Sequence, residues 1–178
     1  KFGIEVPRTV REAIDLDRKT GNTFWLDAIA KEMHEVRVAY QITPDGQSAP
    51  VGYQKIPCHM IFDIKMEDFR RKARLVAGGH RTEAPATITY ASVVSREKVC
   101  IALLMAALND LEVKIGDVLN AYITAPVTKK VWTVLGPEFG NDAGKTAIIV
   151  RAIYGLKSAG AAFRAHLASC MRQMGYTS

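Results

Sequence analysis

The sequence lacks the features that mark several common classes of protein. It has no apolar run near the roughly 20 residues needed to cross a membrane, and residues 1–5 do not have the form of a signal peptide. Its cysteines are only three, widely spaced and odd in number, which excludes a disulfide framework and is typical of reduced thiols inside a cell. Internal repeats, heptad arrays and low-complexity segments are also absent. We therefore expect an intracellular globular protein without a membrane segment.

Zinc ligation and nucleoside triphosphate hydrolysis find no support either. Cys58, His59 and His80 have no second cysteine pair at ligand spacing, so they do not predict a zinc site. The glycine-rich residues 140–146 place three residues between their glycines where the Walker pattern needs four. The apolar residues 147–150 that follow predict a strand and not a helix. Residues 140–146 are therefore interpreted as a connecting loop.

What the sequence does have is apolar content and positive charge. With 178 residues and 48% hydrophobic residues, it can form one ordinary domain with a core or a large part of a bigger one. Its net charge of +6 suits a polyanionic partner, because each neutralised phosphate releases counterions. A basic structural domain without any nucleic-acid role is the alternative. The first residue is not Met and the last residues stop just after a helical pattern, which favours a fragment of a longer polyprotein.

Capping residues and apolar spacing predict two helices in the first part of the chain. Thr9 and Glu12 form a capping box, which predicts a helix to about residue 19 that ends at Gly21. From residue 23 the apolar positions recur at helical spacing, beginning with Trp25 and reaching Val36. Turn residues fill positions 43–50, which we expect to form an exposed loop.

The remainder of the chain mixes strand and helix patterns. Residues 57–77 predict a hairpin, because Met60, Phe62 and Ile64 alternate with polar positions before a turn at 67–68. Residues 82–90 look irregular, and Ser95 is placed to cap a long helix. The further elements expected are strands at 111–117, 130–135 and 146–153 and a last helix at 156–174. This order predicts an α+β fold.

Four side chains in these elements are candidates for chemistry. Asp117 stands at the end of a strand-like run, where a carboxylate is able to hold Mg²⁺, although a turn or cap residue would have the same appearance. Tyr122 follows five residues later and is either a functional ring or a packed core aromatic. Lys72 and Arg74 lie on the returning hairpin strand, where they either bind phosphate or protect a solvated edge.

Three short motifs, in order, carry a resemblance to a known family. The chain reads KARLVA at 72–77, DVLNAY at 117–122 and YGLK at 154–157. It resembles the copia-type retrotransposon reverse transcriptases, which read K-A-R-L-V-A-K-G, then D-V-x-T-A-F-L-N-G, then L-Y-G-L-K-Q-A-P. The resemblance runs from about Trp25 to the C-terminus.

The resemblance implies a right-hand polymerase fold, with fingers and a partial palm built from an antiparallel sheet and flanking helices. Residues 1–50 would be an N-terminal helical lead, 51–95 the fingers hairpin region, and 96–178 the first, incomplete part of the palm. The implied activity is RNA-directed DNA synthesis, a nucleotidyl transfer that uses two Mg²⁺ ions. Its implied partners are deoxynucleoside triphosphates, an RNA or DNA template-primer and the rest of the polyprotein. Its implied location is a cytoplasmic virus-like particle, the nucleus or both.

The resemblance also implies roles for individual residues. Asp117 would be the first metal-binding carboxylate, with the backbone carbonyl of Val118 as a second ligand. Tyr122 would stack under the incoming deoxyribose and exclude a 2′-hydroxyl, in a position where the family usually has Phe. Lys72 and Arg74 would neutralise the β- and γ-phosphates.

The third motif would support the template and the nascent base pair through Tyr154, Gly155, Lys157 and Ser158. Here the sequence departs from the family, because Ser158 stands where Gln is usual and Gly160 where Pro is usual. Ser cannot reach as far toward the sugar and the template as Gln.

The family's second metal site, an Asp-Asp pair, has no counterpart, because the sequence contains no two adjacent aspartates. We therefore expect the isolated fragment to be inactive although the parent protein is a polymerase. A non-catalytic, nucleic-acid-binding relic of a transposon is the main alternative.

Overall fold

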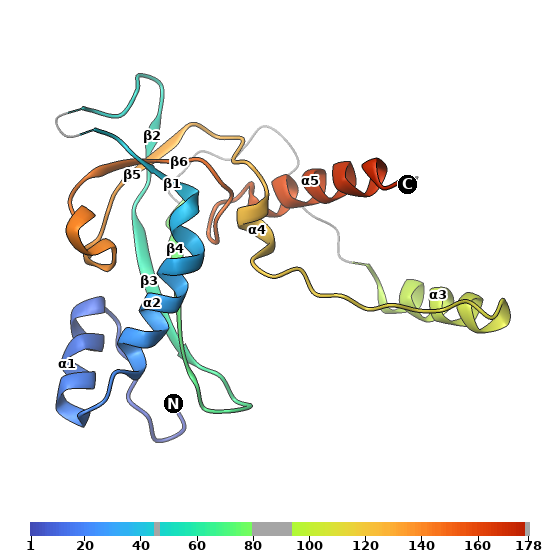
Figure 1. Ribbon diagram of the computed structural model, residues 1–178, viewed down its shortest axis with the longest axis horizontal. Coiled ribbons are helices and arrows are strands. Elements are labelled where there is room, and N and C mark those ends of the chain that lie inside the picture. The colour runs from blue at the N-terminus through green and yellow to red at the C-terminus, as the bar shows by residue number, and fades with distance from the viewer. Residues whose placement is uncertain (45–46, 80–93, 177–178) are drawn as a thin grey trace.

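In the computed structural model, which describes residues 1–44, 47–79 and 94–176, the chain begins with two helices that pack together (Figure 1). α1 (Val10–Thr20) is capped by Thr9, whose hydroxyl accepts a hydrogen bond from the N–H of Glu12. Gly21 ends the helix at a φ of 67°, in the left-handed region. α2 (Phe24–Val36) follows directly. Both helices were predicted from the sequence.

A buried acid that the sequence pattern did not reveal joins the two helices. The side chain of Asp17 is 1% exposed, and its carboxylate accepts hydrogen bonds from the N–H groups of Trp25 and Leu26 at 3.0 and 2.8 Å. These N–H groups belong to the first turn of α2, where helical partners are missing and an anion is favoured. Asp17 therefore fixes the start of α2 against the end of α1.

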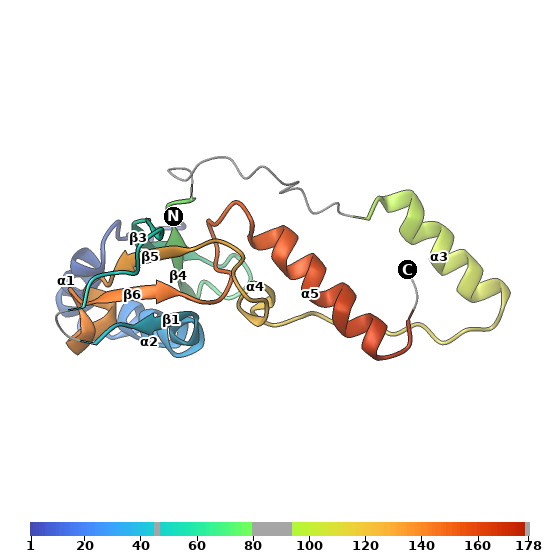
Figure 2. The ribbon, with the colours of Figure 1, turned by 90° about the horizontal axis from the view of Figure 1, so that it is seen from above.

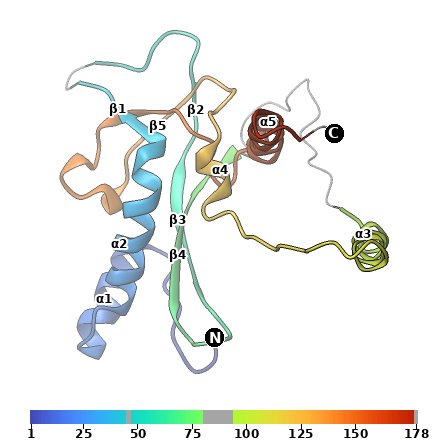
Figure 3. The ribbon, with the colours of Figure 1, turned by 45° about the vertical axis from the view of Figure 1, so that its right-hand side comes forward.

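The predicted hairpin is present as β3 (Cys58–Ile64) and β4 (Arg71–Ala77), which pair antiparallel from Cys58↔Ala77 to Ile64↔Arg71. Met60, Phe62 and Ile64 are buried, as their alternation predicted. α2 packs against this hairpin, and the rings of Trp25 and Phe62 meet edge to face at 5.7 Å. The hairpin therefore has one face covered by α2 (Figure 3).

A second, smaller sheet has the strand order β1-β6-β5-β2. Its strands are β1 (Tyr40–Ile42), β2 (Gln54–Lys55), β5 (Val131–Val134) and β6 (Thr146–Ile149), and only the β2–β5 pair is parallel. A short helix η1 (Arg37–Ala39) leads from α2 into β1, and η3 (Pro137–Asp142) lies between β5 and β6. β6 follows the glycine-rich loop as a strand, which agrees with its interpretation as a connection.

This second sheet draws strands from all three regions predicted at 1–50, 51–95 and 96–178. Those boundaries themselves stay a prediction. The mixed α+β class is confirmed, with mostly antiparallel strands and flanking helices.

The C-terminal half contains α3 (Arg96–Leu108), α4 (Ala121–Thr124) and α5 (Ala159–Gln173). Ser95 caps α3 as predicted, by accepting a hydrogen bond from the N–H of Lys98. α3 stands apart from both sheets in the two views (Figures 1 and 2). Most of its large apolar side chains are exposed, namely Val99, Ile101, Leu103, Leu104, Met105 and Leu108. α3 is therefore an apolar helix that the described part of the chain does not cover.

The strand predicted at residues 111–117 is wrong, because these residues form no regular element. They run as exposed extended chain, and Ile115 is 95% exposed. A strand needs a partner for its backbone groups. No strand in the described residues pairs with this segment.

Among the described residues, no helix has the length and apolar character required to cross a membrane.

Candidate nucleotide site

A groove of about 470 Å³ lies between α2, β4 and the chain that carries Asp117. Its basic lining residues are Lys31, Lys65, Arg70, Arg71, Lys72 and Arg74. Its carboxylates are Glu32, Glu35 and Asp117. Six cations against three carboxylates leave a positive potential, which suits an anionic ligand.

Lys72 and Arg74 face the groove because of the register of β4. Ala73, Leu75 and Ala77 are buried, so the side chains between them point the other way. Partial burial lowers the pKa of Lys72, and the neighbouring Arg74 and Lys65 lower it further. Crowded cations of this kind are stabilised when an anion binds between them.

Arg74 is held by an aromatic ring. Its guanidinium lies 4.1 Å from the centre of the Tyr154 ring, within the range of a cation–π contact. The sequence motifs that contain these two residues therefore meet in space. Tyr154 lines the groove and contacts Arg74 of β4. Its role toward the template stays a prediction.

Asp117 and Val118 also line the groove. Asp117 is exposed and lies in the extended chain before the turn at 119–120. A carboxylate and a backbone carbonyl are oxygen ligands of the kind that Mg²⁺ accepts, and Mg²⁺ commonly takes its other ligands from water and substrate phosphates. The described residues contain no group of three or more His, Cys, Asp or Glu side chains that could hold a metal ion. Metal binding by Asp117 and the carbonyl of Val118 therefore stays a prediction.

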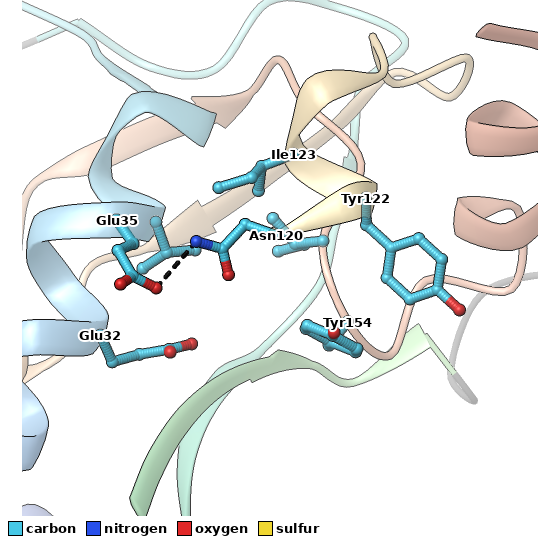
Figure 4. A pocket seen from close by; sticks show the side chains of 8 residues that line it. Glu32, Glu35, Asn120, Tyr122, Ile123 and Tyr154 are labelled. Carbon is cyan, nitrogen blue, oxygen red and sulfur yellow. Dashed lines mark hydrogen bonds between the residues drawn. The ribbon is translucent and has the colours of Figure 1, made fainter. Parts of the chain in front are cut away.

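Tyr122 lies in α4, next to the groove and not in its lining. Its ring meets the rings of Tyr154 and Phe163 edge to face, at 4.8 and 6.3 Å. It lines a small cavity of about 10 Å³, together with Tyr154 and the carboxylates of α2 (Figure 4). Tyr122 as a whole is half-buried.

The motif at 154–158 crosses the end of β4 at close range. The N–H of Ala77 donates to the carbonyl of Tyr154 at 2.8 Å. Gly155 has a φ of 89°, and a Cβ there would collide with the carbonyl oxygen of Ala77. Gly79 has the reciprocal restriction, because a Cβ on it would collide with the carbonyl oxygen of Gly155. Both glycines are therefore required by the crossing of the two backbones.

The next two residues of that motif lie at the start of α5. Lys157 is exposed and Ser158 is the residue before the helix, without a capping hydrogen bond from its side chain. Neither lines the groove. Their roles toward the template and the nascent pair stay predictions. His80, considered for a zinc site, and the segment 82–90 lie outside the described residues.

Sequence reasoning missed Glu32, Glu35 and Asn120. Glu32 accepts a hydrogen bond from the backbone N–H of Leu75 at 2.9 Å, and Glu35 accepts one from Nδ2 of Asn120 at 2.8 Å. Burial raises the pKa of Glu32, while the Leu75 hydrogen bond and Arg74 act in the opposite direction. The two glutamates lie three residues apart on one face of α2, which was the available signal.

Comparison with known proteins gives one family. The model of the family described as reverse transcriptase (RNA-dependent DNA polymerase) matches residues 43–178. No curated protein and no solved structure matches the chain.

Proposed function

Because the chain belongs to the reverse transcriptase (RNA-dependent DNA polymerase) family, we propose that the groove between α2, β4 and Asp117 binds a deoxynucleoside triphosphate for RNA-directed DNA synthesis. The observation that carries the proposal is the shared groove. Lys72, Arg74 and Asp117 all line it, although about 40 residues of sequence separate Asp117 from the two cations. A triphosphate bridges cations and a metal-binding carboxylate in this way.

In the proposed complex, Arg74 and Lys72 bind phosphate oxygens. The planar guanidinium of Arg74 suits two oxygens at once, and the stack on Tyr154 limits the directions in which it can point. Asp117 and the carbonyl of Val118 would hold Mg²⁺. Bound Mg²⁺ would stabilise the charge that develops on the transferred phosphate.

Tyr122 would contact the sugar of the nucleotide. Its ring is fixed on one side by Tyr154 and Phe163, and a fixed ring discriminates by collision with a 2′-hydroxyl. Tyr154, Gly155, Lys157 and Ser158 would lie toward the template and the nascent pair. The parent protein would be a copia-type retrotransposon polyprotein, and two Mg²⁺ ions would act in the complete enzyme.

A non-catalytic, nucleic-acid-binding relic of a transposon is the second candidate. It is favoured by Ser158, which stands where the family usually has Gln. Both candidate functions predict a basic groove, but only the polymerase function requires a nucleotide to bind in it.

Calorimetric titration of the chain with dATP and Mg²⁺ tests the proposal. Arg74→Ala and Lys72→Ala should each weaken binding about tenfold, because a charge-assisted hydrogen bond contributes about 1.5–3 kcal/mol and ~1.4 kcal/mol is tenfold. Lys19→Ala, which removes the same charge from α1, should leave the dissociation constant unchanged. A wild-type chain that does not bind dATP, or equal affinity in all the variants, would contradict the proposal.

A further inference from the structure

α2 contributes two carboxylates that each reach a different wall of the proposed nucleotide groove. Glu32 accepts a hydrogen bond from the N–H of Leu75 in β4. Glu35 accepts one from the side-chain amide of Asn120, in the turn before α4 (Figure 4). These contacts span 43 and 85 residues of sequence. One helical turn therefore holds two segments that are far apart in the chain.

The Glu32 contact acts on the basic wall. The side chain of Leu75 is fully buried, so the residue before it in β4, Arg74, must face the groove. By accepting a hydrogen bond from the backbone N–H of Leu75, Glu32 fixes the distance between α2 and β4 at Leu75. Leu75 directly follows Arg74, the proposed phosphate ligand. Glu32 also carries negative charge close to Arg74 and Lys72.

The Glu35 contact holds the turn that contains Asn120. Asn120 has a φ of 50° and a ψ of 41°, a left-handed conformation in which Asn is among the few non-glycine residues tolerated. It precedes the first residue of α4, between Asp117 and Tyr122 in sequence. A hydrogen bond from its side chain to Glu35 therefore limits the movement of the turn that carries both of these groups.

We propose that Glu32 and Glu35 are positioning residues, which set the separation between the phosphate-binding strand and the Asp117–Tyr122 segment and thereby the preference for deoxyribonucleotides. The inference rests on the proposed function of the groove. Discrimination by collision depends on the placement of the ring, and small misplacements have large effects. Loss of the Glu35–Asn120 contact should therefore affect discrimination more than phosphate affinity.

The test compares dissociation constants for ATP and dATP, with Mg²⁺, in the wild-type chain and its variants. Glu35→Ala and Asn120→Ala should each lower the ratio of the ATP to the dATP dissociation constant about fivefold. The double variant should lower it no further than either single one, because the two side chains act through one contact. Glu35→Gln keeps an oxygen acceptor and should retain most of the ratio. His34→Ala, an exposed change on the same helix, is the control and Tyr122→Ala the positive reference.

The effect of Glu32 on phosphate binding is tested with inorganic tripolyphosphate, which has no sugar. Glu32→Gln keeps the acceptor for Leu75 and removes the negative charge beside Arg74, so affinity for tripolyphosphate should rise about threefold. Glu32→Ala should accelerate hydrogen exchange at the Leu75 amide, and Glu35→Ala should accelerate it over residues 117–124 but not at Leu75.

The outcomes separate the inference from the proposed function. If the wild-type chain binds neither nucleotide, both are overturned. If it binds dATP and the ratio is the same in Glu35→Ala as in His34→Ala, only the positioning role is overturned. A lower melting temperature in Glu35→Ala with an unchanged ratio would give Glu35 a purely structural role and would also overturn it.

Discussion

Asp117 is the residue on which the proposed metal chemistry depends, and it reaches the groove from an exposed, irregular segment. In the proposed complex, Asp117 would be one of few protein ligands of Mg²⁺, and water and substrate phosphates would supply the others. The expected consequence is that nucleotide and Mg²⁺ bind with mutual enhancement.

Replacing Asp117 by Asn should weaken this enhancement. Asn keeps the size of the side chain but loses the charge that attracts Mg²⁺, so dATP affinity should depend less on Mg²⁺ concentration than it does in the wild-type chain. Titrations of dATP at several Mg²⁺ concentrations measure the effect. Asp110→Asn, an exposed change earlier in the same segment, should keep the wild-type dependence. The same dependence in Asp117→Asn would exclude Asp117 as a metal ligand.

Two half-buried glutamates should make stability fall as the pH rises. Burial raises the pKa of Glu32 and the pKa of Glu138 above their ordinary value of 4.5. The folded chain then keeps these protons to higher pH than the unfolded chain, so the free energy of unfolding decreases from about pH 4.5 through the raised values. Glu32→Gln and Glu138→Gln should each flatten this decrease.

Urea unfolding curves between pH 4 and about 7 measure that slope. Asp63→Asn serves as the control, because the hydrogen bond from Lys1 lowers the pKa of Asp63 below its ordinary value of 3.8. The stabilisation that the ionised Asp63 provides is lost only as the pH falls through this lowered pKa. Asp63→Asn should therefore leave the slope above about pH 4.5 unchanged. A steeper slope in either Gln variant would contradict the sign of the prediction.

Among the elements, those with strong local signals were predictable. α1 follows from its capping box and its terminal glycine, and the β3–β4 hairpin follows from alternation that the structure buries on one face. The segment 111–117 shows the limit of such reasoning, because a strand-like run of residues does not determine whether another strand pairs with it. The predicted site residues Lys72, Arg74 and Asp117 line one groove, while the contacts of Glu32 and Glu35 depend on tertiary packing.

α3 should behave as an exposed apolar surface in solution. Leu104 is 58% exposed within a group of other exposed apolar side chains, so Leu104→Lys should reduce the fluorescence of a bound hydrophobic dye such as anilinonaphthalene sulfonate. The free energy of unfolding should change by less than about 0.5 kcal/mol, as for surface substitutions in general. Val38→Lys, an exposed apolar position away from α3, should leave dye binding unchanged. A large loss of stability in Leu104→Lys would instead mean that α3 is covered.

At the scale of the whole molecule, the net charge of +6 should govern binding to a template-primer. The logarithm of the association constant should fall linearly with the logarithm of salt concentration, with a slope of about −0.9 for each duplex phosphate neutralised. Lys157→Ala, at the proposed template side, should reduce the steepness by about one contact. Lys19→Ala on α1 should not. Binding that does not respond to salt would contradict both the polymerase and the relic readings.

The crossing of Gly155 over the end of β4 has a kinetic consequence. The groove is lined by residues of α2, of β4 and the turn before it, by residues 117–120 and by Tyr154, so it is complete only when distant parts of the chain have met. Contacts of this kind must overcome the entropy of closing long loops before they contribute stability, and they slow folding. The hairpin and the helix pair can form early from local contacts. The nucleotide site, closed by backbones that pass each other at two glycines, should be among the last parts of the protein to reach its native geometry during refolding.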